Sequence, residues 1–137
     1  MEARSQRVFL LLILAQAAHS SEEYVTRLYE VFAPARFVAG LVSSNLALGF
    51  LIANLCLVIF GLLCWAVPVR LRWRAAPGLV WFWIIIELAN GIVHSTLALR
   101  HGGYFPGVAT APLLFGLAVW LAVLQTRRQS PGRLQTG

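Results

Sequence analysis

The chain has 137 residues, of which 59% are hydrophobic and only 12% are charged. This composition leaves too little polar material to cover the surface of a water-soluble domain, so it excludes an ordinary soluble protein and favours an integral membrane protein. The net charge of +6 comes from arginines that stand in short groups beside apolar runs. Such placement is typical of arginines that orient membrane segments, so no nucleic-acid partner is expected.

Four apolar stretches approach the length of about 20 residues that a helix needs to cross a bilayer. They predict helices over residues 8–27, 45–67, 79–99 and 106–124. The last stretch reaches this length only if Pro106 opens the helix as a first-turn proline. The predicted fold class is therefore all-α, a four-transmembrane-helix bundle that forms a single domain over residues 1–137.

The segments between these helices differ in character. Residues 68–78 and 100–107 are rich in proline and glycine and are predicted to be loops. Residues 30–44 are moderately apolar and are interrupted at Pro34. They predict a loop followed either by an interfacial segment or by an extension of the second helix. The polar residues 127–137 predict a disordered tail.

The first apolar stretch also has the features of a secretory signal, with arginines before an apolar core and an A-x-A arrangement at Ala15 and Ala17. Cleavage after Ala17 would leave three spans. Against cleavage, Val25 and Leu28 allow the helix to continue past the polar residues that follow the core. The distribution of arginines also fits four retained spans better than three.

Arginines are divided unequally between the two sides of a four-span chain. One side carries Arg27, Arg36 and Arg100, and the other carries Arg4, Arg7, Arg70, Arg72, Arg74, Arg127, Arg128 and Arg133. Because cytoplasmic segments are enriched in basic residues, both termini are predicted to face the cytoplasm.

Two polar stripes interrupt the predicted spans near the opposite, outer surface. They consist of His19, Glu22 and Glu23 on the first span, and Glu87, Asn90 and His94 on the third. Residues three, four or seven positions apart share one side of a helix. Ionisable groups at such depth are costly when they face lipid, so the two stripes are expected to face each other inside the bundle.

These side chains form a ligand set that suits a divalent transition metal such as zinc, iron or manganese. The candidate ligands are His19, Glu22, Glu23, Asn90 and His94. Glu87 and Asn45 are candidates for the layer around them, and Glu87 is open to three roles: proton carrier, partner of His94, or neutral acid. Two simpler interpretations stay open. The histidines and acids can pair without a metal and lock the helices together, or the two adjacent glutamates can be solvated at a helix end.

Three motifs, HSSEE at residues 19–23, NGIVH at 90–94 and YFPGVATA at 104–111, resemble in the same order the signatures of the HXXEE-domain family of small membrane proteins. The resemblance implies a bacterial plasma (inner) membrane protein with several spans, a retained first span, a helical fold and an enzymatic, metal-dependent activity whose reaction is not established. The positions that it marks are His19, Glu22, Glu23, Asn90, His94, Tyr104, Pro106, Gly107 and Thr110.

A reaction can be formulated from these residues. A metal held by His19, His94 and one carboxylate would activate water, with the second carboxylate as base. The tight entry that Pro106 and Gly107 make, with its exposed amide groups and the Thr110 hydroxyl, would receive the developing negative charge. Tyr104 would close the mouth of the site or act as an acid. Glu22, Glu23, Tyr104 and Thr110 are thus the candidate catalytic residues.

The expected function is a metal-dependent hydrolase that acts on a lipid-like or membrane-partitioned substrate at the outer leaflet, with the site facing the periplasm. One alternative is a small oligomeric transporter or proton-coupled carrier that uses Glu87, Asn90 and His94 as a relay. The other is a non-catalytic membrane partner in which the polar cluster only locks the bundle. Membrane lipid is an expected partner, and a homo-oligomer stays open.

Overall fold

The computed structural model describes residues 2–129, and every regular element within that range is helical. The elements are α1 (Ala3–Val25), α2 (Leu28–Val31), α3 (Ala33–Val42), α4 (Leu46–Cys64), the π-helical turn η1 (Trp65–Val69), α5 (Ala76–Arg100) and α6 (Ala111–Gln129). The predicted all-α class is therefore confirmed for this part of the chain.

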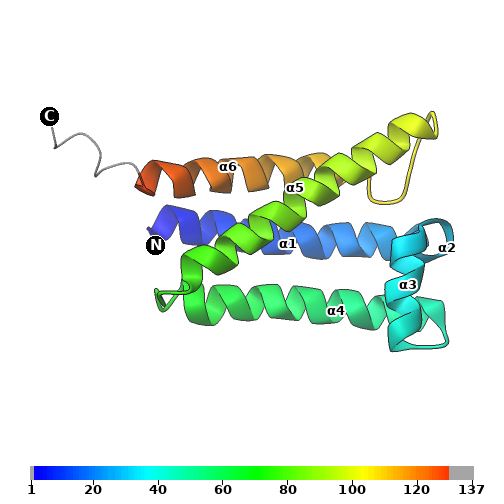
Figure 1. The fold of residues 1–137 in the computed structure, drawn as a ribbon, viewed down its shortest axis with the longest axis horizontal. Helices are drawn as coiled ribbons and strands as arrows, with labels where there is room; N and C mark the ends of the chain where they lie inside the picture. The colour runs from blue at the N-terminus through cyan, green and yellow to red at the C-terminus, as the bar shows by residue number, and fades with distance from the viewer. Residues whose placement is uncertain (1, 130–137) are drawn as a thin grey trace, which may run out of the picture.

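The four long helices form an elongated bundle (Figure 1). Helix α1 lies between α4 and α6, while α5 crosses them diagonally and packs most extensively on α6. Helices α1 and α5 run in one direction, and α4 and α6 run in the other. The short helices α2 and α3 lie at the same end of the bundle as the α5–α6 connection.

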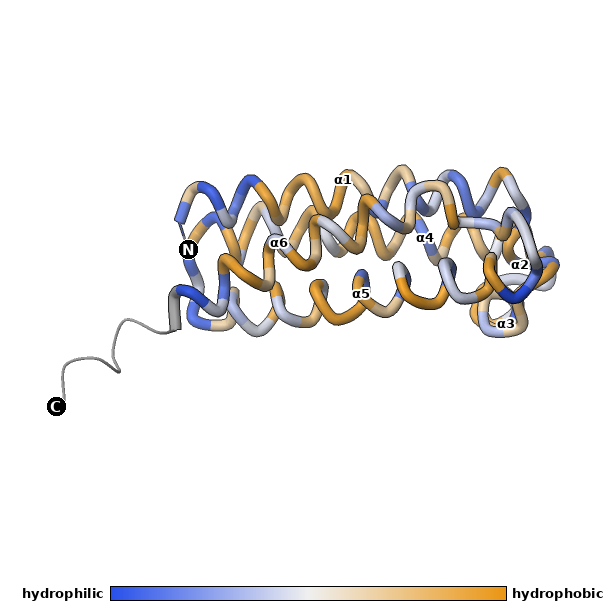
Figure 2. Tube along the Cα trace, turned by 90° about the horizontal axis from the view of Figure 1, so that it is seen from above, coloured by the Kyte–Doolittle hydropathy of each residue, from blue (hydrophilic) through white to orange (hydrophobic). Residues whose placement is uncertain are grey.

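Two apolar cores lie one after the other along the bundle. The larger joins α1, α5 and α6 through buried side chains such as Phe9, Trp83 and Leu114. The smaller lies at the α2–α3 end and is built around side chains such as Tyr29 and Phe50. Hydrophobic residues predominate along the middle of the helices, and hydrophilic residues gather where α1 begins (Figure 2). The candidate ligands His19, Glu23 and His94 therefore lie between two packed apolar regions.

Two helical segments, Leu46–Val69 and Ala76–Arg100, are long and apolar enough to cross a membrane. Of the four predicted spans, these two meet this criterion within the described part of the chain. Helix α1 carries His19, Glu22 and Glu23 in its last two turns, which lowers its hydropathy. The apolar part of the last helix is short, Ala111–Arg127.

The late start of α6 corrects the prediction that Pro106 opens this helix. Residues 106–110 form turns instead, and Gly107 has a φ angle of 89°. A positive φ of this size is readily adopted by glycine and is incompatible with an α-helix. The chain therefore becomes helical only at Ala111.

Other predicted boundaries shift for local reasons. Pro34 lies in the first turn of α3, where proline is well tolerated, so residues 33–42 form a separate helix and not an extension of the next one. The predicted loop at 68–78 is shorter, because η1 includes Pro68 and α5 begins at Ala76. Residues 127–129 of the predicted tail belong to α6, and residues 130–137 lie outside the described residues.

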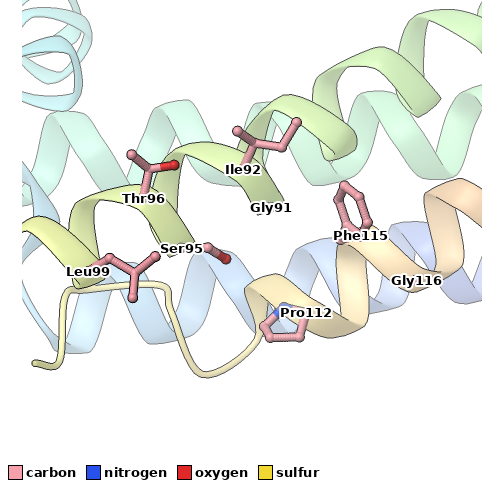
Figure 3. Close-up of a pocket in the computed structure, with 8 residues that line it drawn as sticks. All are labelled: Gly91, Ile92, Ser95, Thr96, Leu99, Pro112, Phe115 and Gly116. Carbon is pink, nitrogen blue, oxygen red and sulfur yellow. The ribbon is translucent and has the colours of Figure 1, made fainter.

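A groove of about 430 Å³ lies between α5 and α6 (Figure 3). Its lining consists mainly of apolar and small side chains such as Ile92, Leu99 and Phe115, and its polar side chains are Ser95 and Thr96. It includes none of the candidate ligands, so the chemistry of the described residues has to be sought elsewhere in the bundle.

Helices α3 and α4 approach each other closely at Gly49. A Cβ atom at this position would lie 2.1 Å from the backbone oxygen of Ala39, which cannot move away as a flexible side chain can. Glycine is therefore required for α3 to dock on α4 and cover this end of the bundle.

We expect Gly49→Ala to lower the free energy of unfolding by about 1–3 kcal/mol, the usual cost of forcing extra volume into a packed contact. Gly116→Ala in α6 is the matched control, because a Cβ there meets no heavy atom within 4 Å. Thermal unfolding followed by circular dichroism measures both. Equal stability of the two variants would contradict the close α3–α4 contact.

Candidate metal centre

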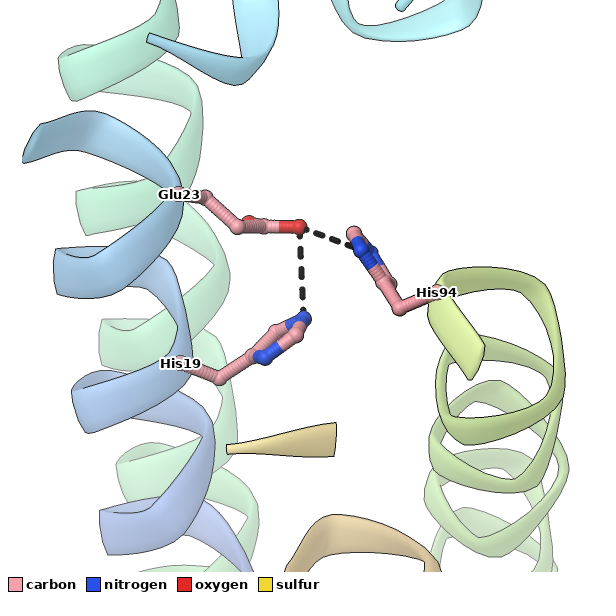
Figure 4. Close-up of side chains that lie close together, drawn as sticks. All are labelled: His19, Glu23 and His94. Carbon is pink, nitrogen blue, oxygen red and sulfur yellow. Dashed lines mark ion pairs between the residues drawn. The ribbon is translucent and has the colours of Figure 1, made fainter. Parts of the chain in front are cut away.

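Three buried side chains meet between α1 and α5. His19 and Glu23 extend from consecutive turns of α1, and His94 extends toward them from α5 (Figure 4). Their exposed fractions are 0%, 8% and 3%. A ligand atom from each lies within 4.8 Å of the other two. The structure thus brings one stripe of α1 and one stripe of α5 together at a single point.

The contacts centre on one carboxylate oxygen. Glu23 Oε1 lies 3.2 Å from His19 Nε2 and 3.1 Å from His94 Nε2. Ligands at about 2.0–2.1 Å from a tetrahedral zinc ion lie roughly 3.3–3.4 Å from one another, close to these spacings. His19 Nε2 makes no hydrogen bond even though Glu23 lies nearby. These two spacings allow a shared ion, and they also lie within ordinary hydrogen-bonding distance.

The opposite nitrogen of His94 fixes the position of its proton. His94 Nδ1 lies 2.6 Å from the backbone oxygen of Pro106. A carbonyl oxygen can only accept, so Nδ1 carries the hydrogen and donates it. In a neutral imidazole the other nitrogen, Nε2, is then unprotonated, and its lone pair points at Glu23.

The proton of His19 is placed on Nδ1 in a similar way, by Thr110 and its bond to Glu22. His19 Nδ1 lies 2.7 Å from the Thr110 hydroxyl, which in turn lies 2.6 Å from Glu22 Oε2. The hydroxyl has one hydrogen, and an ionised carboxylate is a stronger acceptor for it than a ring nitrogen. Thr110 therefore donates to Glu22 and accepts from His19 Nδ1. This again leaves Nε2 of the ring unprotonated and facing Glu23.

Gly107 permits the loop to approach both rings. A Cβ atom at this position would lie 2.6 Å from His94 Nδ1 and 2.9 Å from His19 Cε1. The two rings themselves are 4.8 Å apart between centroids and nearly perpendicular. Any side chain at position 107 would push the histidines apart, and the positive φ independently favours glycine.

These features can be compared with known proteins. Residues 10–121 match the family model described as a protein of unknown function with an HXXEE motif. The chain belongs to this HXXEE family. No curated protein and no solved structure matches the chain. The HXXEE pattern corresponds to His19, Glu22 and Glu23, so its two glutamates can now be assigned separate places in the fold.

Glu22 of the HXXEE motif lies outside the three-residue cluster. Its Oε1 accepts hydrogen bonds from the Tyr104 hydroxyl at 2.6 Å and the Ala109 amide at 3.1 Å, and its Oε2 accepts from the amide and hydroxyl of Thr110 at 2.9 and 2.6 Å. Its carboxylate is thus occupied by the loop that precedes α6. The amides before α6 were expected to receive an external anion, but here they hold Glu22 itself.

Tyr104 contributes to this anchor and lies away from the cluster. Its ring is 59% exposed, and its hydroxyl donates to Glu22. Partial burial and the neighbouring Glu22 carboxylate raise the pKa of Tyr104 above its ordinary value. The phenol therefore keeps its proton at neutral pH and stays a hydrogen-bond donor to the loop anchor.

Three other predicted residues have local partners instead of a place among the ligand atoms. Asn90 donates to Glu87 at 3.2 Å. Asn45 is exposed and caps α4 by accepting from the Leu48 amide, because an asparagine just before a helix satisfies a free N–H group. Glu87 is fully buried about two turns before His94 on α5. Asn90 and Glu87 therefore form a second polar group beside the cluster.

Gln16 of α1 completes this second group and was not among the predicted site residues. With its amide nitrogen toward Glu87, Gln16 donates to the two carboxylate oxygens at 2.9 and 3.1 Å, and its own oxygen lies 3.0 Å from the Ser20 hydroxyl. Ser20 in turn donates to Asn54 of α4 at 2.7 Å. A polar residue three positions before His19 within an apolar run was the available signal. The contact of His94 with the backbone oxygen of Pro106 was also not predicted, because every residue has a backbone oxygen and residue type does not mark this one.

We expect Glu22→Gln to loosen the loop over residues 104–110, because one acceptor oxygen is replaced by an NH₂ group that faces donors. Charge-assisted hydrogen bonds contribute about 1.5–3 kcal/mol each, so amide hydrogen exchange in the loop should accelerate by roughly tenfold or more. Hydrogen–deuterium exchange with mass spectrometry measures this.

Glu30→Gln is the control for that experiment, since Glu30 is exposed and pairs only loosely with Arg27 at 3.6 Å. Its exchange in residues 104–110 should equal that of the unmodified protein. Unchanged protection of the loop in Glu22→Gln would show that Glu22 does not anchor it.

Proposed function

We propose that this protein is a metal-dependent enzyme of the bacterial plasma membrane, a hydrolase whose substrate is lipid-like or partitions into the membrane at the outer leaflet. The observation that supports it is the convergence of His19 Nε2, His94 Nε2 and Glu23 Oε1, with both Nδ1 atoms already engaged as donors. Three electron-rich atoms that face one another in a buried site are stabilised by a cation between them.

Protons are a poor substitute for that cation. Protonating both rings would place two positive charges 4.8 Å apart between centroids, opposed by one carboxylate in a buried site. Protonating one ring would leave the lone pair of the other facing an acceptor. A divalent ion satisfies all three atoms at once. The hydrogen bonds from Nδ1 to Pro106 and Thr110 are also the contacts that orient metal-binding histidines in proteins.

Two histidines and one carboxylate form the ligand set of hydrolytic zinc sites and of iron sites with open coordination positions. A zinc, iron or manganese ion bound there would lower the pKa of a water molecule and make it a nucleophile. Glu23 is the carboxylate at the centre, since Glu22 is engaged by the loop. Thr110 and Pro106 hold the rings in orientation, and Gly107 leaves room for both.

The proposed membrane arrangement has four spans, with α1 and α6 accompanying α4 and α5. Large apolar side chains are exposed on all four long helices, for example Leu14, Leu55, Ile85 and Val119. Apolar surface of this extent needs a nonaqueous environment. The start of α1, the α4–α5 connection and the end of α6 share one end of the bundle and carry most arginines, which supports cytoplasmic termini and a periplasmic site.

A proton-coupled carrier is the second candidate, and the buried chain from Glu87 through Gln16 and Ser20 to Asn54 favours it. Within the described part of the chain, the side chains that bond to Glu87 are the uncharged amides of Asn90 and Gln16. Such a carrier would produce substrate flux in proteoliposomes that follows a proton gradient and is abolished in Glu87→Gln. A hydrolase would show no such dependence.

Purified protein should retain about one equivalent of transition metal, measured by elemental analysis. His19→Ala, His94→Ala and Glu23→Gln should each release it, because each removes one of three ligands. Thr110→Val should weaken binding by roughly 10–100-fold, the usual cost of losing the hydrogen bond behind a ligating histidine.

His101→Ala is the matched histidine control, since His101 is exposed and its Nδ1 contacts only the backbone oxygen of Leu97. It should retain the metal in full. Unmodified protein that binds no added zinc, iron or manganese, or ligand variants that bind as well as His101→Ala, would refute the proposal.

A further inference from the structure

We infer that a cleft between α4 and α5 binds the hydrocarbon chain of an uncharged amphiphile, which enters sideways from the bilayer and places its polar group at the His19–Glu23–His94 cluster. This inference names the substrate class of the proposed enzyme and so rests on the proposed function. Three features of the cleft support the inference: its shape, its end at the cluster and the side chains that line it.

The cleft has a volume of about 490 Å³, within the range of pockets that hold small ligands. Its walls come from α3, α4 and α5, and Glu23 and His94 form part of its lining. It is distinct from the groove between α5 and α6, which includes none of the cluster residues. A molecule in the cleft would therefore contact the candidate metal ligands directly.

The helices on either side diverge. Helices α4 and α5 contact each other sparingly, and aromatic contacts of Phe60 with Phe82 and Trp83 lie near their connection. From there α5 runs diagonally away from α4 toward the end covered by α3 (Figure 1). The two helices are also the segments with the length and hydropathy of membrane spans. An opening between such helices faces the hydrocarbon of the bilayer and not water.

The chemistry of the walls indicates the kind of molecule that fits. Apolar side chains dominate the lining, among them Phe50, Leu57 and Ile86. The polar members besides Glu23 and His94 are amides: Gln16, Asn54 and Asn90. Amide side chains donate and accept hydrogen bonds without charge. Beyond the hydrogen bonds that they make within the protein, their remaining donors and acceptors suit an ester, amide or hydroxyl group next to a hydrocarbon chain.

A phosphate headgroup is a poorer match. Phosphate sites in proteins are built from arginine, lysine or clustered backbone N–H groups. Among the described residues that line the cleft there is no arginine. The exposed arginines stand at the two ends of the bundle instead.

The test uses the full-length protein in lipid nanodiscs and a long-chain monoacylglycerol that carries a diazirine near its chain terminus. After irradiation, mass spectrometry should locate the label on α4 and α5 along the cleft. Val93→Trp narrows the cleft from α5, and Ala53→Phe does so from α4. Each should reduce labelling of these helices by about tenfold, the change that 1.4 kcal/mol of lost binding free energy produces.

Val119→Trp is the matched control, because Val119 of α6 and Val93 are both valines of similar exposure, 41% and 38%. It should label as the unmodified protein does. Unlabelled monoacylglycerol should displace the probe at lower concentration than a lysophosphatidic acid of the same chain length. Equal labelling of Val93→Trp, Ala53→Phe and Val119→Trp, or stronger displacement by the phosphate lipid, would overturn the inference.

Metal content measured on the same samples separates the two proposals. Localised labelling of a protein that binds no added metal would support the cleft as a lipid site and refute the metal enzyme. Full metal content with label spread evenly over the bundle surface would refute the cleft alone.

Discussion

The hydrogen bond from His94 Nδ1 to the backbone oxygen of Pro106 is the constraint on which the rest of the site depends. Because a carbonyl cannot donate, this bond places a proton on Nδ1, and in the neutral ring the lone pair is then on Nε2. The Thr110 hydroxyl does the same for His19 through its own bond to Glu22. In their neutral forms, both rings therefore turn an unprotonated Nε2 toward the same carboxylate oxygen. The proposed metal is the simplest group that reconciles these three atoms.

The two adjacent glutamates of the HXXEE motif have different roles in this site. Successive residues on an α-helix differ in direction by about 100°, so Glu22 and Glu23 cannot serve the same point. Glu23 faces the histidines, whereas Glu22 holds the loop whose oxygen atoms orient them. Gly107 allows that loop to lie against both rings. The motif thus specifies a ligand together with the support for the other ligands.

Helical periodicity and depth were sufficient to predict that α1 and α5 face each other through His19 and His94, because polar groups in apolar helices avoid lipid. They did not assign Glu22 to the loop, since two of its four hydrogen-bond donors are backbone amides, which residue types do not reveal. Nor could they predict α3 as a separate helix, which depends on Pro34 in its first turn and on the contact at Gly49. The prediction that Pro106 opens α6 failed because Gly107 takes a positive φ.

Nitrogen-15 NMR of histidine side chains tests the central claim most directly, because it reports which ring nitrogen of His19 and His94 carries a proton. The account predicts that both rings keep the proton on Nδ1 and that added zinc shifts the two Nε2 resonances, while the His101 signals stay unchanged. Protons on both Nε2 atoms in the presence of zinc, or zinc-dependent shifts at Nδ1 instead, would contradict it.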